Sequence, residues 1–118
     1  MHSTSLAGRS ILIVEDEPLI ALNIGLAFEK AGAAVVAARC LPDAVRLVER
    51  DGLSAAVLDF GLGDGDAKTL CGRLKERNIP FVLHSGYAHV SAACHGGTVI
   101  PKPADPETLI DAVAGLLH

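Results

Sequence analysis

The chain has 118 residues and a formal charge of −4; 50% of its residues are hydrophobic and 3% are aromatic. This length suits one domain whose core is built mainly from aliphatic side chains. The acidic balance, without a run of Lys and Arg, argues against a nucleic-acid surface. No apolar run approaches the ~20 residues of a membrane span, and residues 1–10 lack the long apolar segment of a secretion signal. We therefore expect a cytoplasmic protein that contacts neither nucleic acid nor membrane directly.

The cysteines give no indication of a covalent scaffold. Cys40, Cys71 and Cys94 are widely spaced, odd in number and form no CxxC pair. We expect all three to be reduced thiols, as is usual in the cytoplasm.

Five short apolar runs predict buried strands. They cover residues 11–14, 33–38, 55–59, 81–84 and 98–100. Continuous apolar character is typical of strands that are covered on both faces. Residues 1–9 are small and polar, so we expect a loose lead-in before a single domain over residues 10–118. His84 ends the fourth run, and we expect it in the core or near a site.

The stretch after the first run predicts a helix. Pro18 suits the first helical turn, and Gly32 suits the position after the last turn. Between them, Leu19, Leu22 and Leu26 have the spacing of one helical face.

Further helices follow the second, third and fifth runs. Pro42 opens the second helix, Asp64 or Asp66 caps the third, and Asp105 caps the last. Residues 88–97 specify a helix only weakly. Alternation of strands and helices predicts an α/β fold, a five-stranded parallel sheet with helices on both faces.

Polar residues follow four of the apolar runs, at the point where each strand should end. Glu15 and Asp16 follow the first run, Asp59 ends the third, Ser85 follows the fourth and Lys102 follows the fifth. Because parallel strands share one direction, these side chains converge on one edge of the sheet, where ligands bind in such folds.

The chemistry of this set favours phosphoryl transfer. Clustered carboxylates repel one another unless a cation lies among them. Glu15, Asp16 and Asp59, with the backbone carbonyl of Gly61, are candidate ligands for Mg²⁺. Lys102 offers a point charge for phosphate oxygens, and an aspartate can act as the nucleophile that forms an acyl phosphate. The plainer alternative is that Asp59 begins a turn or caps a helix.

In this order, the motifs resemble those of the receiver domains of two-component response regulators. The residues that carry the resemblance are 11–18, 57–59, 85–86 and 102–103. The resemblance covers essentially the whole chain and implies a flavodoxin-like (βα)5 fold in which Asp59 is the phosphoacceptor.

The resemblance also implies a role for each neighbour of Asp59. Asp16 would bind Mg²⁺ directly, Glu15 would contribute through water, and Gly61 would give its backbone carbonyl. Ser85 would move toward the phosphoryl group, and Lys102 would contact its oxygens. The bond between Lys102 and the proline that follows it is expected to be cis.

The implied function is that of a switch rather than an enzyme. A histidine kinase or phosphotransfer protein would donate the phosphoryl group to Asp59. A downstream protein would then bind the face formed by residues 88–97, the strand at 98–100 and the last helix. Val99 stands where the family usually has a switch aromatic, so Tyr87 is the candidate switch.

The sequence is also compatible with three other functions. The chain could be an adaptor that works without phosphorylation, or a phosphate sink that drains a kinase. A flavin protein on a similar fold would need a phosphate cradle of Gly, Ser and Thr after Val14, where Glu15, Asp16 and Glu17 stand instead. No output domain follows before His118, so we expect action through protein contacts or a place within a longer protein.

Overall fold

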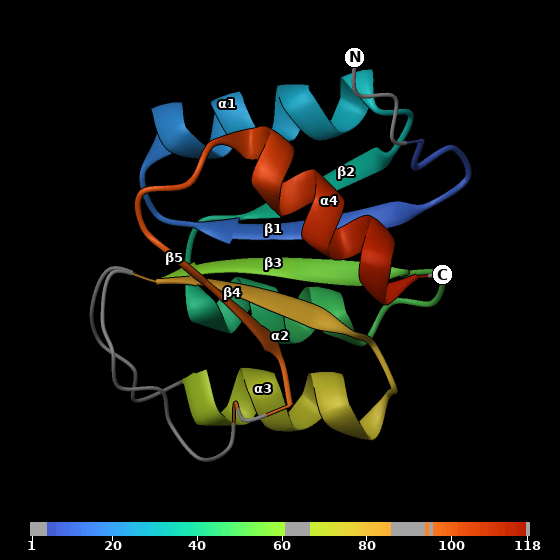
Figure 1. The fold of residues 1–118 in the computed structure, drawn as a ribbon. Helices are drawn as coiled ribbons and strands as arrows, with labels where there is room; N and C mark the ends of the chain where they lie inside the picture. Colours follow the sequence, from blue (N-terminus) through green and yellow to red (C-terminus); the bar gives the residue numbers. More distant parts are fainter. Residues whose placement is uncertain (1–4, 61–66, 86–93, 95, 118) are drawn as a thin grey trace.

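The computed structural model describes residues 5–60, 67–85, 94 and 96–117 (Figure 1). Within these ranges, no helix has the length and apolar character needed to cross a membrane. The elements in chain order are β1 (Ser10–Glu15), α1 (Pro18–Lys30), β2 (Ala34–Ala38), α2 (Leu41–Val48), β3 (Ala55–Phe60), α3 (Ala67–Glu76), β4 (Phe81–Ser85), β5 (Thr98–Pro101) and α4 (Pro106–Leu116).

The strands form one parallel sheet in the order β2-β1-β3-β4-β5. Helices α1 and α4 cover one face of this sheet, and α2 and α3 cover the other (Figure 1). The predicted α/β architecture is confirmed. The register places Glu15 beside Asp59, and Asp59 beside His84. Polar groups at three neighbouring strand ends are therefore brought together.

Two apolar cores explain why the strand sequences are apolar throughout. Leu12 and Leu58 pack with α2 and α3, whereas Ile13 and Val57 pack with α1 and α4. Successive side chains of a strand point to opposite faces, so a strand covered on both faces needs an apolar residue at every position. The polar residues are consequently displaced to the strand ends.

Leu6 extends the folded unit toward the N-terminus. Its side chain is only 1% exposed and packs in the same core as Phe28. The backbone N–H of Leu6 donates to the carbonyl of Ala31 at 2.7 Å. Gly32 lies at φ +101°, and a Cβ there would come within 3.1 Å of the backbone of Ala7. The expectation of a loose lead-in is therefore wrong for this part of residues 1–9.

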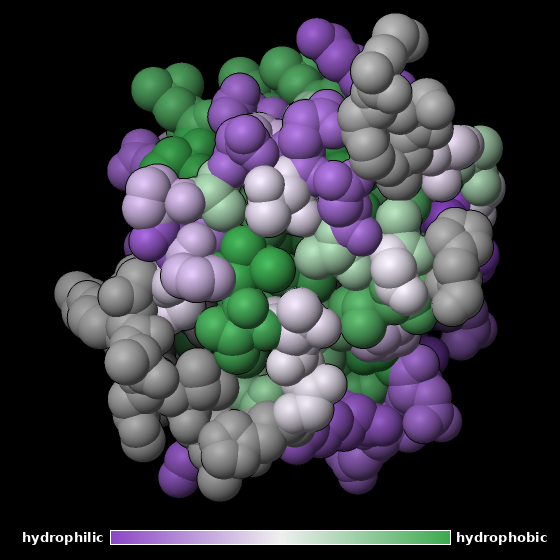
Figure 2. Space-filling view, viewed as in Figure 1, coloured by the Kyte–Doolittle hydropathy of each residue, from purple (hydrophilic) through white to green (hydrophobic). Residues whose placement is uncertain are grey.

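The predicted helix α1 is confirmed, but its buried face is a different one. Ile24 and Phe28 are buried, whereas Leu19 is 74% exposed and Leu22 is 57% exposed. Ile20 and Leu26 are also exposed, and hydrophobic residues gather on the surface where α1 lies (Figure 2). A helix that is apolar on more than one side leaves the choice of buried face to tertiary packing. We call Leu19, Ile20, Leu22 and Leu26 the α1 apolar face.

The cysteine prediction is wrong for two of the three residues. Cys71 in α3 forms a disulfide with Cys94, and their Cα atoms are 5.0 Å apart. Both side chains are buried, whereas Cys40 is free and exposed. Disulfide connectivity cannot be deduced from spacing alone, because the fold decides which cysteines meet.

The disulfide is expected to stabilise the fold. Its sequence separation is 23 residues, for which the loss of unfolded-chain entropy corresponds to about 3 kcal/mol. Urea unfolding with and without reductant should show a decrease in the free energy of unfolding of this order. Cys40→Ser is the matched control and should leave the unfolding curve unchanged. Identical curves with and without reductant would contradict the pairing.

Candidate functional site

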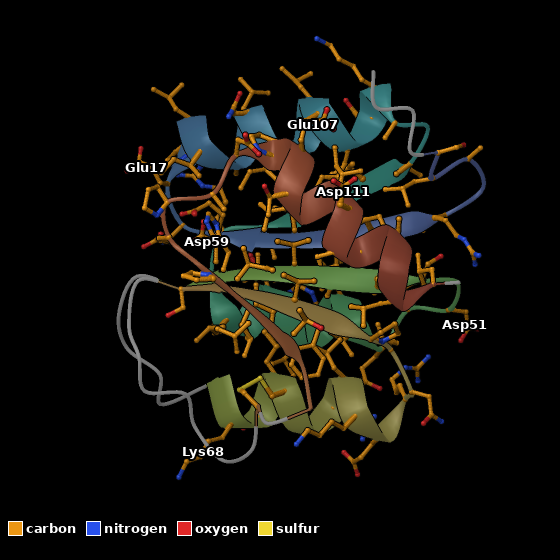
Figure 3. The ribbon with its side chains drawn as sticks, in the orientation of Figure 1. Glu17, Asp51, Asp59, Lys68, Glu107 and Asp111 are labelled. Carbon is orange, nitrogen blue, oxygen red and sulfur yellow. A yellow bond between two sulfur atoms is a disulfide. The ribbon has the colours of Figure 1, made fainter. Side chains whose placement is uncertain are left out.

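The candidate site lies at the carboxyl ends of the central strands. Figure 3 shows Asp59 at the end of β3, at the same end of the sheet as Glu17, which precedes α1. The side chain of Asp59 is only 2% exposed. A buried carboxylate is expensive unless charged or hydrogen-bonding groups surround it, so its neighbours define the site.

Two nitrogen groups contact the carboxylate of Asp59, one at each oxygen. The ammonium of Lys102 forms an ion pair with Oδ1, and Nδ1 of His84 donates a hydrogen bond to Oδ2 at 3.1 Å. A backbone hydrogen bond positions Lys102: its N–H donates to the carbonyl of Ser85 at 3.0 Å. The expected cis bond between Lys102 and Pro103 is confirmed. Asp59 therefore connects β3 to β4 and to the loop after β5.

Glu15 brings a second buried carboxyl group to the same point. Burial, a hydrogen bond with the Asp59 side chain, a hydrogen bond with Asp16 and the charge of Asp59 raise the pKa of Glu15 to about 8. The backbone N–H of Glu17, which donates to Oε2 of Glu15 at 2.7 Å, opposes this increase. Without a cation, two negative charges on Glu15 and Asp59 would therefore repel each other unfavourably.

The donor set fits Mg²⁺. In the described part of the chain, no three His, Cys, Asp or Glu side chains form a complete metal site by themselves. Mg²⁺ does not need one, because it binds one or two carboxylates and completes its shell with water or phosphate oxygens. Oε1 of Glu15 is buried and has no hydrogen-bond partner among the described residues. A cation beside Glu15 and Asp59 would remove both the repulsion and the unpaired oxygen.

The structure brings together only part of the predicted site. Asp16 is exposed, and its side chain contributes to the raised pKa of Glu15. Ser85 is half-buried at the end of β4, in register with Pro101 of β5. Gly61 and Tyr87, predicted as a carbonyl ligand and a switch, lie outside the described residues.

His84 was expected in the core or near a site, and its near-site position is confirmed. Its direct contact with the Asp59 carboxylate was not predicted. The sequence does carry an indication of this contact, because His84 is a polar residue at the end of an otherwise apolar strand. That indication becomes specific only once the β3–β4 register is known.

Glu15→Gln is expected to make the stability of the metal-free protein less dependent on pH. Between the ordinary value of 4.5 and the folded-state pKa of about 8, the folded chain keeps a proton that the unfolded chain has lost. The stabilisation that comes from protonated Glu15 is complete below about pH 4.5, decreases as the pH rises and is lost above about pH 8. Urea unfolding in chelator, at pH values across this window, measures it.

The exposed neighbour Glu17 provides the control for this experiment. Glu17→Gln should keep the pH dependence of the wild type. An equally steep decrease in stability in Glu15→Gln and wild type would contradict the assignment.

Comparison with known proteins is consistent with this geometry. A family model described as response regulator receiver domain matches residues 11–114. An uncharacterized 14.6 kDa protein from the sodA1 3′ region of Leptolyngbya boryana is 30% identical over 118 residues, covering 92% of this chain and 90% of that protein.

Solved structures show the same fold. A response regulator receiver protein from Sinorhizobium medicae WSM419 matches with a TM-score of 0.81 and 27% identity, covering 96% of this chain and 97% of that one. A CheY-like receiver domain protein from Methanospirillum hungatei JF-1 matches with a TM-score of 0.81 and 24% identity, covering 92% and 93%. With the family match extending over residues 11–114, the chain belongs to the response regulator receiver domain family.

Proposed function

We propose that this receiver domain is a phosphoacceptor in a two-component phosphorelay, with Asp59 as the residue that is phosphorylated in the presence of Mg²⁺. The observation that carries the proposal is the buried carboxylate of Asp59 with the ammonium of Lys102 at Oδ1. A histidine kinase or histidine phosphotransfer protein would supply the phosphoryl group, in keeping with the family.

The residues of the site have complementary tasks in this reaction. A carboxylate oxygen of Asp59 attacks phosphorus, and the bond from phosphorus to the donor breaks with its electron pair on the donor. Lys102 neutralises charge on the phosphoryl oxygens, and Glu15 and Asp16 hold the cation. When bound, Mg²⁺ supplies further neutralisation of these oxygens.

Phosphorylation would act as a switch rather than as a step in metabolism. Ser85 lies at the end of β4, the strand between β3 and β5, and its hydroxyl would respond to a new phosphoryl group on Asp59. A downstream protein would bind the surface of β5 and α4 and favour one of two states of that surface. Residues 88–97, which precede β5 in the chain and are also expected on this surface, lie mostly outside the described residues.

The phosphodonor protein would dock on the α1 apolar face. Leu19 and Ile20 follow Glu17 and Pro18, so this face begins beside the site. Exposed apolar patches of several neighbouring residues mark protein contacts, and amphipathic helices of a partner fit such a surface.

We place the protein in the cytoplasm, since phosphodonors derived from nucleoside triphosphates are made inside the cell. Disulfides are rare in that compartment. The disulfide between Cys71 and Cys94 is therefore an exception to this pattern, whereas Cys40 is a free thiol.

The first test is the phosphorylation of Asp59 itself. Incubation with Mg²⁺ and a small acyl phosphate should produce a labile phosphoryl adduct, seen by intact mass spectrometry. Asp59→Asn should lose the adduct, because the amide is not a nucleophile here, and chelator should suppress it. Asp51→Asn, at an exposed carboxylate, is the control and should keep it. No adduct on folded wild-type protein would favour the adaptor function.

The second test separates docking from chemistry. Leu22→Ser should slow phosphotransfer from a phosphodonor protein by about fivefold or more, because it removes apolar contact area from the interface. The rate from a small acyl phosphate should not change. Val99→Ser is the matched control, an exposed apolar residue on β5. Equal slowing with both donors would place the defect in the site instead of the interface.

A further inference from the structure

We propose that His84 shortens the lifetime of the phosphorylated state by stabilising the Asp59 carboxylate as it leaves the phosphoryl group. The inference rests on the phosphoacceptor function proposed above. It assigns each oxygen of Asp59 a different task. The phosphoryl group attaches to Oδ1, beside the ammonium of Lys102, and Oδ2 becomes the carbonyl oxygen beside His84.

The contact between His84 and Asp59 is within hydrogen-bond distance and shielded from water. Nδ1 of His84 lies 3.1 Å from Oδ2 of Asp59, and their side chains are 9% and 2% exposed. A carboxylate oxygen only accepts, so Nδ1 carries the proton that is donated, whatever the charge of the ring. In such an environment a hydrogen bond to a charged group is stronger than in water.

The second ring nitrogen of His84 strengthens the argument. Nε2 is buried and has no hydrogen-bond partner among the described residues. A buried polar atom without a partner is unfavourable, and its presence in a folded protein calls for an explanation. A leucine or methionine at this strand position would avoid that disadvantage. Among the described residues, the hydrogen bond from Nδ1 to Asp59 is therefore the contact that explains why a histidine stands at this position.

The direction of the effect follows from the charge on Oδ2. In the free carboxylate, Oδ2 shares a full negative charge, whereas in the acyl phosphate it is a neutral carbonyl oxygen. During hydrolysis, the oxygen of water bonds to phosphorus and the bond from phosphorus to Oδ1 breaks. Its electron pair stays on the regenerated carboxylate, and both protons of the water end on inorganic phosphate. The N–H of His84 therefore binds the product and the transition state more strongly than the acyl phosphate.

Three substitutions separate this role from packing. His84→Met fills similar space without a donor. His84→Asn places an amide N–H at the branch position that Nδ1 occupies, whereas His84→Gln places it one carbon further, near the position of Nε2. Asn and Gln both bury an amide, so a general defect in folding would affect both.

The measurement is the decay of the phosphorylated protein after the small acyl phosphate donor is removed, with Mg²⁺ present, followed by intact mass spectrometry. We expect the half-life to be about tenfold longer or more in His84→Met and His84→Gln, the effect of losing one charge-assisted hydrogen bond. His84→Asn should decay at nearly the wild-type rate.

Two results would overturn the inference while leaving the phosphoacceptor function intact. One is a His84→Met protein that decays as fast as wild type. The other is an equal change in all three variants, which would indicate packing rather than a donated hydrogen bond. Folded wild-type protein that takes no phosphoryl group at Asp59 would overturn both proposals together.

Discussion

The structure depends on one constraint, the burial of the charge on Asp59. A buried carboxylate without partners costs several kcal/mol, more than a small domain tolerates at one residue. The partners of Asp59 come from different parts of the chain, His84 from β4 and Lys102 from the loop after β5. They meet only because β3 and β4 are parallel and in register, so that their polar residues end at the same level. The parallel sheet thus brings together the groups that stabilise this buried charge.

Glu15 shows that the site is not arranged for maximum stability. A second carboxyl group in register with Asp59 has its pKa raised to about 8, mainly because it is buried. A sequence selected only for stability would place an apolar residue at this position. Local conflicts of this kind are typical of functional sites, and the rest of the fold must compensate for them. Here the compensation is the pair of apolar cores on the two faces of the sheet.

Much of this arrangement could be predicted from the sequence, and the failures have physical reasons. The apolar runs fixed the strands, and Asp59 and Lys102 could be placed together because parallel strands end at one edge. The orientation of α1 could not be predicted, because Leu22 and Ile24 are both apolar and only tertiary packing selects between them. The pairing of Cys71 with Cys94 and the burial of Leu6 are likewise long-range outcomes. Local patterns carry no information about such contacts.

The order of the strands separates the proposed input surface on α1 from the β5 part of the proposed output surface, although α4, the other part of that output surface, packs against α1. Helix α1 packs against β1 and β2, whereas β5 lies at the opposite edge of the sheet. A phosphodonor protein on the α1 apolar face and a downstream protein on β5 would therefore approach from different sides. Asp59 lies between them on the central strand, joined to the β5 side through His84 and Lys102. A change in the bonding of Asp59 must alter these two contacts first, because they are the groups that hold its oxygens. The same contacts that make the buried charge tolerable are thus the shortest route by which its phosphorylation could reach the output surface.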